Sequence, residues 1–209
     1  MLPFTTDQFF QLFESYNRTI WPVHIVGYGL AGFVLWAILT NRYWNWRAAS
    51  GVLSLLWLWN GIAYHLAFFT SINPVAYGFA ILFVAQGLLF FASALSERGP
   101  YFVVGKDWRT AIALATITYA LIIYGVLGSL AGHGWPRAPV FGVAPCPTTI
   151  FTFGVLMLAG PSVPGWLAAF PIVWALIGST AAVLLGVPED LGLLVSASIF
   201  LATSRRRLN

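Results

Sequence analysis

Charged residues are scarce in this chain of 209 residues, because Asp, Glu, Lys and Arg together make up only 8% of it. Soluble domains contain roughly 25% charged residues. Hydrophobic residues account for 59% of the chain, and the mean hydropathy is +0.83. A water-soluble fold of this size has too little interior for so much apolar surface. The composition therefore predicts an integral membrane protein whose surroundings are the lipid bilayer.

Further absences exclude several classes of chemistry. Cys146 is the only cysteine, which excludes an internal disulfide and a CxxC metal site. Lys106 is the only lysine and falls in a predicted loop, so no lysine inside the bundle is available for a retinal Schiff base. Glycine-rich nucleotide loops, HExxH and GxSxG do not occur. No basic segment followed by an apolar stretch opens the chain, so we expect no signal peptide.

Long uncharged runs dominate what is present. Five of them have 19 to 22 residues, enough to cross a hydrocarbon core of about 30 Å as helices: 21–39, 48–69, 75–95, 110–131 and 166–185. Two further runs, 148–160 and 191–203, have 13 residues each. The sequence therefore predicts an all-α integral membrane protein with about seven transmembrane helices, of which the fifth and seventh are short.

The basic residues predict the orientation. With the N-terminus outside, eight of the ten fall on the inner side: Arg42, Arg47, Arg98, Lys106, Arg109, Arg205, Arg206 and Arg207. Only Arg18 and Arg137 then lie outside. Cytoplasmic loops of membrane proteins carry such an excess of Lys and Arg. We therefore expect an N-out/C-in, multi-pass protein of the bacterial inner (cytoplasmic) membrane. The net charge of +4 does not indicate a nucleic-acid partner, because the basic residues are spread between and after the apolar runs.

The segment before the first run is amphipathic. Phe9, Phe10, Leu12, Phe13 and Tyr16 recur at helical spacing between polar residues. We expect a short helix on the outer surface, capped by Thr6 or Asp7, which contacts lipid or packs on the bundle. The chain then forms a single membrane domain, 1–209, made of the amphipathic segment 1–20, the bundle 21–203 and a basic cytoplasmic tail 204–209.

This topology brings most polar side chains toward the outer face. All three histidines, the only thiol and one acidic pair lie there, and the two short helices begin there. Half-helix N-termini often point at a substrate in transporters. The candidate pocket comprises His24, Asn60, Tyr64, His65, His133, Cys146, Thr148, Thr149, Glu189 and Asp190.

Four stretches resemble an uncharacterised family of bacterial multi-pass membrane proteins, known only as a domain of unknown function. They are PFTTDQFF, LWLWNGIAYHLAFFTSINP, PCPTTIFTFGVLML and GVPEDLGLL. The resemblance covers nearly the whole chain. It implies a membrane location and brings no established activity, so it assigns no role to any residue.

Each candidate site has a structural and a functional interpretation. Cys146 either packs at a helix start, or is a thiolate at the positive end of the helix dipole that binds a soft metal or reacts with an oxidant. His65 is either a neutral imidazole bonded to a neighbouring helix, or a proton relay or a ligand to haem or a transition metal. His133 and Cys146 are the further metal ligands in the latter case.

Two other features also have alternatives. Glu189 and Asp190 either favour a helix N-terminus or bind a cation or proton. The glycines Gly125, Gly128 and Gly132 predict close helix packing, within the chain or with a second copy or another membrane protein.

Three functions follow. The first is binding or transport of a small solute or metal ion through an outward-facing polar pocket. The second is a haem- or metal-dependent redox enzyme of the membrane, and the third is a structural subunit without chemistry.

Overall fold

The computed structural model describes residues 2–40, 42–96, 99–102, 104–159 and 163–205, and every regular element in these ranges is helical. The α-helices are α1 (Thr6–Ile20), α2 (Val23–Leu39), α3 (Asn45–Trp59), α4 (Ala76–Leu95), α5 (Trp108–Thr118), α6 (Tyr124–Leu130), α7 (Pro145–Leu158), α8 (Trp166–Gly178), α9 (Thr180–Leu184) and α10 (Leu191–Arg205). Two π-helices, η1 (Asn60–Phe68) and η3 (Tyr119–Ile123), and two 3₁₀ turns, η2 (Phe69–Ser71) and η5 (Pro188–Asp190), complete the set.

Several of these elements run on into one another. Four continuous helices in the described residues are long and apolar enough to cross a membrane: Asn45–Ser71, Ala76–Leu95, Trp108–Leu130 and Trp166–Leu184. The pair α1 and α2 passes the same test together but bends by 82° between them. Large apolar side chains such as Ile81 and Val183 project outward from the spanning helices. The all-helical, membrane-compatible class predicted from composition is therefore confirmed, with four or five helices of spanning length.

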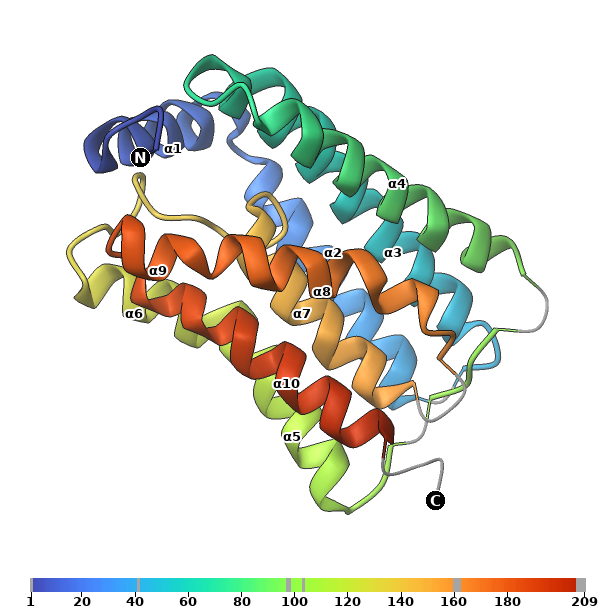
Figure 1. Ribbon diagram of the computed structural model, residues 1–209. Coiled ribbons are helices and arrows are strands. Elements are labelled where there is room, and N and C mark those ends of the chain that lie inside the picture. Colours follow the sequence, from blue (N-terminus) through green and yellow to red (C-terminus); the bar gives the residue numbers. More distant parts are fainter. Residues whose placement is uncertain (1, 41, 97–98, 103, 160–162, 206–209) are drawn as a thin grey trace.

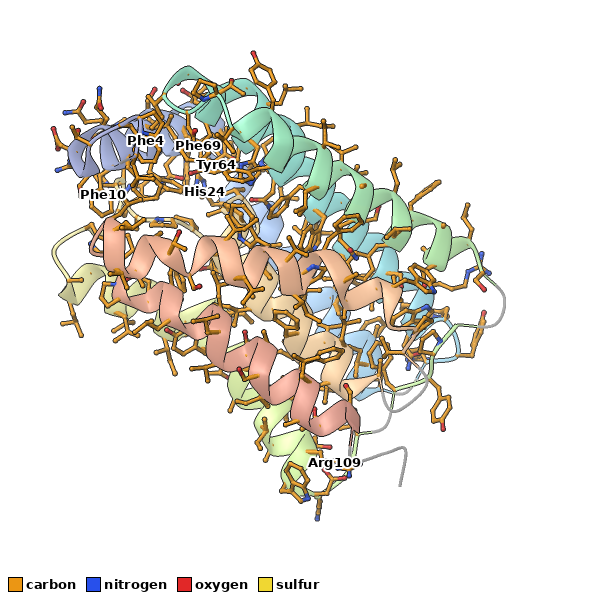
Figure 2. The ribbon with its side chains drawn as sticks, in the orientation of Figure 1. Phe4, Phe10, His24, Tyr64, Phe69 and Arg109 are labelled. Carbon is orange, nitrogen blue, oxygen red and sulfur yellow. The ribbon has the colours of Figure 1, made fainter. Side chains whose placement is uncertain are left out.

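The helices run back and forth between two ends of a bundle (Figure 1). Helix α1 lies across one end, which we call the α1 end. The turns between α4 and η2, between α6 and α7, and between α9 and α10 lie there too. Phe4, Phe10, His24, Tyr64 and Phe69 gather at this end, whereas Arg109 lies at the opposite one (Figure 2).

Helix α7 forms the centre of the bundle. All 14 of its residues are buried, and it packs against α3, α5, α8 and α10. It begins at Pro145, three residues before the predicted start of the fifth helix, and ends at Leu158. Proline fits the first helical turn because its missing N–H has no intrahelical acceptor there. A helix of 14 residues covers only about 21 Å, so the chain reaches its start through an irregular segment that is itself enclosed by protein.

That segment, residues 136–144, has buried carbonyls that water cannot reach, and side chains satisfy them instead. The Asn17 side-chain amide donates to the carbonyls of Pro136, at 2.7 Å, and Ala138, at 2.8 Å. The Tyr16 hydroxyl donates to the Val143 carbonyl at 2.9 Å. Helix α1 therefore holds the outer part of the segment.

The inner part is held at Gly142. Its carbonyl accepts from Asn60 Nδ2 at 3.1 Å, and its N–H donates to Thr148 Oγ1 at 3.2 Å. Gly142 has φ of +84°, and a Cβ there would lie 3.1 Å from the Cα of Gly27. Glycine is required here because only it adopts this conformation at such close contact without strain.

Helix α1 packs on the bundle with the face that its sequence pattern predicted. Phe9, Phe10, Leu12, Phe13 and Tyr16 are all buried. Its N-cap is Thr5, not Thr6 or Asp7 as expected. The Thr5 hydroxyl accepts from the Gln8 N–H, and the Gln8 side chain accepts from the Thr5 N–H. This reciprocal capping box satisfies two N–H groups, which neither expected residue achieves.

We predict that Asn17→Ala destabilises the protein by about 2–4 kcal/mol, because one buried and one partly buried carbonyl lose their donor. Ser15→Ala, an exposed position on the same helix, is the matched control, with an expected effect within about 0.5 kcal/mol. Unfolding of the purified proteins in detergent micelles, followed by tryptophan fluorescence, measures both. Equal stabilities would show that the segment 136–144 does not depend on α1.

Candidate functional site

A cavity of about 120 Å³ lies at the α1 end, between α1 and the ends of the spanning helices. Phe4, Phe9 and Phe13 form the wall that comes from the N-terminal segment and α1. A cavity needs only about 10–15 Å³ of such volume to hold one water. This one therefore has room for a small molecule.

The opposite walls are also aromatic. They come from Tyr64 on η1, Phe69 on η2, Phe79 on α4 and Trp174 on α8. The sequence predicted a polar pocket, whereas apolar and aromatic side chains dominate the lining of this cavity. Tyr64, Cys146 and Asp190 are the predicted pocket residues that line it. Most of the others bond to backbone or to one another instead.

Polar side chains do line part of the cavity, namely those of Tyr64, Asn73, Cys146, Thr180 and Asp190. Two of them, Cys146 and Asp190, belong to the N-terminal ends of short helices. Cys146 lies in the first turn of α7, and Asp190 directly precedes α10. The Asp190 carboxylate accepts from the Tyr124 hydroxyl at 2.5 Å and from the Cys146 thiol. Burial outweighs these hydrogen bonds and raises the pKa of Asp190 to about 7. The thiol and one acid of the acidic pair, which the sequence placed toward the same face, are thus in contact in the structure.

The neighbouring acid points elsewhere. Glu189 Oε1 lies 2.7 Å from Nε2 of His133, and both side chains are buried. The His133 ring stacks on Phe10 of α1, with ring centroids 4.6 Å apart. Asp7 of α1 pairs with Arg137 at 2.5 Å. Helix α1 is therefore fastened to the 131–144 connection beside the Glu189–His133 pair.

His65 does not line the cavity but lies behind its wall. Its ring is fully buried, and neither nitrogen has a hydrogen-bond partner in the described part of the chain. Trp174 and Phe79, which line the cavity, contact it at centroid distances of 5.1 and 5.7 Å. The neutral-imidazole interpretation expected a bond to a neighbouring helix, and the structure instead surrounds His65 with aromatic rings.

His24 and the two threonines serve the backbone. His24 Nε2 lies 3.1 Å from Asn17 Oδ1. Because the Asn17 amide donates to two carbonyls, its Oδ1 accepts and His24 carries its proton on Nε2. Thr148 accepts from Gly142 and donates to the Ala144 carbonyl, and Thr149 donates to the Pro145 carbonyl. Together with Asn60, these candidates shape the entry to α7.

The three expected metal ligands do not converge. His65 lies among aromatic rings, His133 pairs with Glu189, and Cys146 faces Asp190. No three His, Cys, Asp or Glu side chains in the described ranges come together as a metal site. The Cys146 thiol donates to a carboxylate, which is an arrangement of the neutral thiol rather than of the thiolate that the helix dipole suggested.

Sequence reasoning missed Tyr124, Trp174 and Tyr119. Tyr119 donates to the backbone carbonyl of Glu189 at 2.8 Å, and Trp174 has an indole N–H beside the thiol without a well-formed hydrogen bond. The two tyrosines belong to or follow a π-helix, because η3 begins at Tyr119 and ends at the residue before Tyr124. The other π-helix, η1, contains Tyr64 of the cavity wall. π-Helical turns are frequent at functional sites. A signal existed in the sequence, because aromatic residues with polar tips inside apolar runs need a partner.

The glycines of α6 allow a matched test. A Cβ at Gly128 would lie 2.8 Å from Glu189 Oε1 and 3.4 Å from the His133 ring, whereas nothing lies within 4 Å of one at Gly125. The absence of a side chain at Gly128 therefore leaves room for the buried Glu189–His133 pair rather than for a second helix.

We predict that Gly128→Ala destabilises the protein by about 1–3 kcal/mol, while Gly125→Ala is neutral or stabilises it by up to about 1 kcal/mol. Chemical denaturation in micelles measures both, and equal effects would contradict the assignment.

Comparison with known proteins gives a family and no activity. No curated protein and no solved structure matches the chain. Residues 6–208 match the family of unknown function DUF6064, which agrees with the resemblance carried by the four sequence stretches. Because the match covers nearly the whole chain, the protein belongs to the DUF6064 family.

Proposed function

We propose that the protein is a single seven-helix domain of the bacterial inner membrane, with the α1 end outside and the C-terminus in the cytoplasm. Alongside α1, the described residues contain seven helical bodies when contiguous helices are joined. The central helix α7 lacks spanning length, but irregular backbone at membrane depth is tolerated when protein encloses it. Arg109 lies at the end opposite α1, and so does the turn from α2 to the start of α3, which carries Arg42 and Arg47, as expected of a cytoplasmic face.

We predict that a C-terminal green fluorescent protein fusion is fluorescent in bacterial cells and that a C-terminal alkaline phosphatase fusion is inactive. The reason is that phosphatase folds only after export, and the basic tail stays inside. The same reporters fused after residue 135, in the α6–α7 connection, are the reciprocal control and should give the opposite result. An active C-terminal phosphatase would overturn both the orientation and the seven-span count.

Binding of a small solute at the α1 end is the function that the site supports best. The observation that carries it is one cavity bordered by Asp190 and Cys146, two polar side chains that come from the N-terminal ends of two short helices. Ligand pockets of this kind are largely apolar and contain a few placed polar groups. Helix α1 covers one side of the cavity from outside the bundle.

Because Cys146 is the only cysteine and lines the cavity, the wild-type protein carries its own probe. We predict that methyl methanethiosulfonate, a small neutral reagent, modifies Cys146 and that a solute bound in the cavity slows the reaction. Ala181→Phe, which places a ring at a cavity-lining position, should slow it at least tenfold without any solute. Val183→Phe, exposed on the same helix, should leave the rate unchanged. Mass spectrometry of timed samples measures the rates.

Two outcomes would contradict the proposal. One is that Ala181→Phe and Val183→Phe react at the wild-type rate, which would mean that the reagent does not reach Cys146 through the cavity. The other is that a broad panel of neutral, anionic and cationic small molecules leaves the wild-type rate unchanged. The protein would then act as a structural subunit without a ligand.

A further inference from the structure

The Asp190 carboxylate has no cationic partner within the described ranges. The ion pairs there join Arg18 to Glu14, His133 to Glu189, and Arg137 to Asp7. No Lys or Arg lines the cavity, and Asp190 is 2% exposed. A buried charge without a counter-ion is costly, and proteins normally pair or neutralise it. The protein therefore leaves room for a positive charge next to Asp190.

The hydrogen bonds of Asp190 hold its carboxylate in place but leave some of its acceptor sites unoccupied. An ionised carboxylate has about four acceptor sites, and Tyr124 and Cys146 occupy two of them from outside the cavity or at its wall. The N-terminal ends of α7 and α10 also favour negative charge at this position. Asp190 retains acceptor capacity toward the cavity, which it lines.

The remaining surface of the cavity suits an organic cation better than a metal ion. Aromatic side chains line the space from both sides, and aromatic rings attract cations that lack a tightly held water shell. A divalent metal ion needs several oxygen, nitrogen or sulfur ligands, and the described residues offer no such group of three. An engineered cavity of about 150 Å³ admits benzene, so about 120 Å³ fits a compact ammonium ion.

We infer that the cavity binds a small organic ammonium ion, with Asp190 as its counter-ion and Tyr64, Phe69, Phe79 and Trp174 as its aromatic lining. This inference rests on the proposed binding function and names the class of its ligand. The cation contacts the aromatic lining with its methyl or methylene groups and the carboxylate with its charge. No covalent step is involved.

Binding then depends on pH through Asp190. The groups that face it are Tyr124 of α6, Cys146 of α7 and Tyr64 of η1, with the neighbouring Glu189 paired to His133. Because the pKa of Asp190 is raised to about 7 in the free protein, the carboxylate is mostly charged at pH 8 and mostly protonated at pH 6. The cation binds only the charged form, so its affinity should fall about tenfold over this interval.

The test compares choline with 3,3-dimethyl-1-butanol, which has the same shape with carbon in place of the charged nitrogen. Both are titrated into the purified full-length protein at pH 8, with binding followed by calorimetry and by protection of Cys146. We expect choline to bind at least tenfold more tightly than the neutral compound. Asp190→Asn should weaken choline binding at least tenfold, abolish its pH dependence and leave binding of the neutral compound unchanged.

A second variant keeps the test decisive if Asp190→Asn does not fold. Phe79→Leu keeps an apolar wall but removes a ring face, and it should weaken choline several-fold more than the neutral compound. Equal binding of the two compounds, or unchanged choline binding in both variants, would overturn the ammonium inference while the cavity remains a binding site. If these two compounds and the broader panel all fail to protect Cys146, the proposed binding function fails as well.

Discussion

The need to satisfy buried backbone in the segment 136–144 organises the α1 end of the protein. This segment carries the chain into the bundle so that α7 can begin at Pro145, and it has no helix or sheet to supply its hydrogen bonds. Side chains from α1, η1 and α7 supply them instead, through Tyr16, Asn17, Asn60 and Thr148. Removing one of these donors leaves a carbonyl without water in an apolar surrounding, which is more costly than losing a surface hydrogen bond.

The sequence predicts the elements better than the site because the two depend on different information. Apolar runs and the pattern of Phe9, Phe10 and Phe13 are local, so the helices and the buried face of α1 can be read from them. Lateral contacts are not local: Tyr124 and Asp190 are 66 residues apart, and no spacing rule connects them. The same limit applies to His65 and Cys146, because similar predicted depth does not say which side chains lie between them; in the structure the Trp174 ring contacts His65 and lies beside the thiol.

Several polar residues that suggested chemistry turn out to serve the backbone. Asn60 and Thr148 hold Gly142, and His24 orients Asn17. A buried segment without regular hydrogen bonding requires polar neighbours, and so does a binding site. In a sequence, both therefore appear as polar residues within or beside apolar runs. Asp190 and Cys146 differ from these residues, because they border a cavity and their side chains bond to each other and to Tyr124 rather than to backbone.

The adjacent acids Glu189 and Asp190 have different partners, although both lie in the same 3₁₀ turn, η5. Glu189 pairs with His133, which stacks on Phe10 of α1, so this acid contributes to fastening α1 onto the bundle. Asp190 lines the cavity that Phe9 and Phe13 of α1 also line. The same short helix therefore satisfies the buried segment, contacts the ion pair and closes the cavity. Any movement of α1 that opens the cavity must also break hydrogen bonds from Tyr16 and Asn17 to buried carbonyls, so access to the cavity and stability of the α7 entry are coupled.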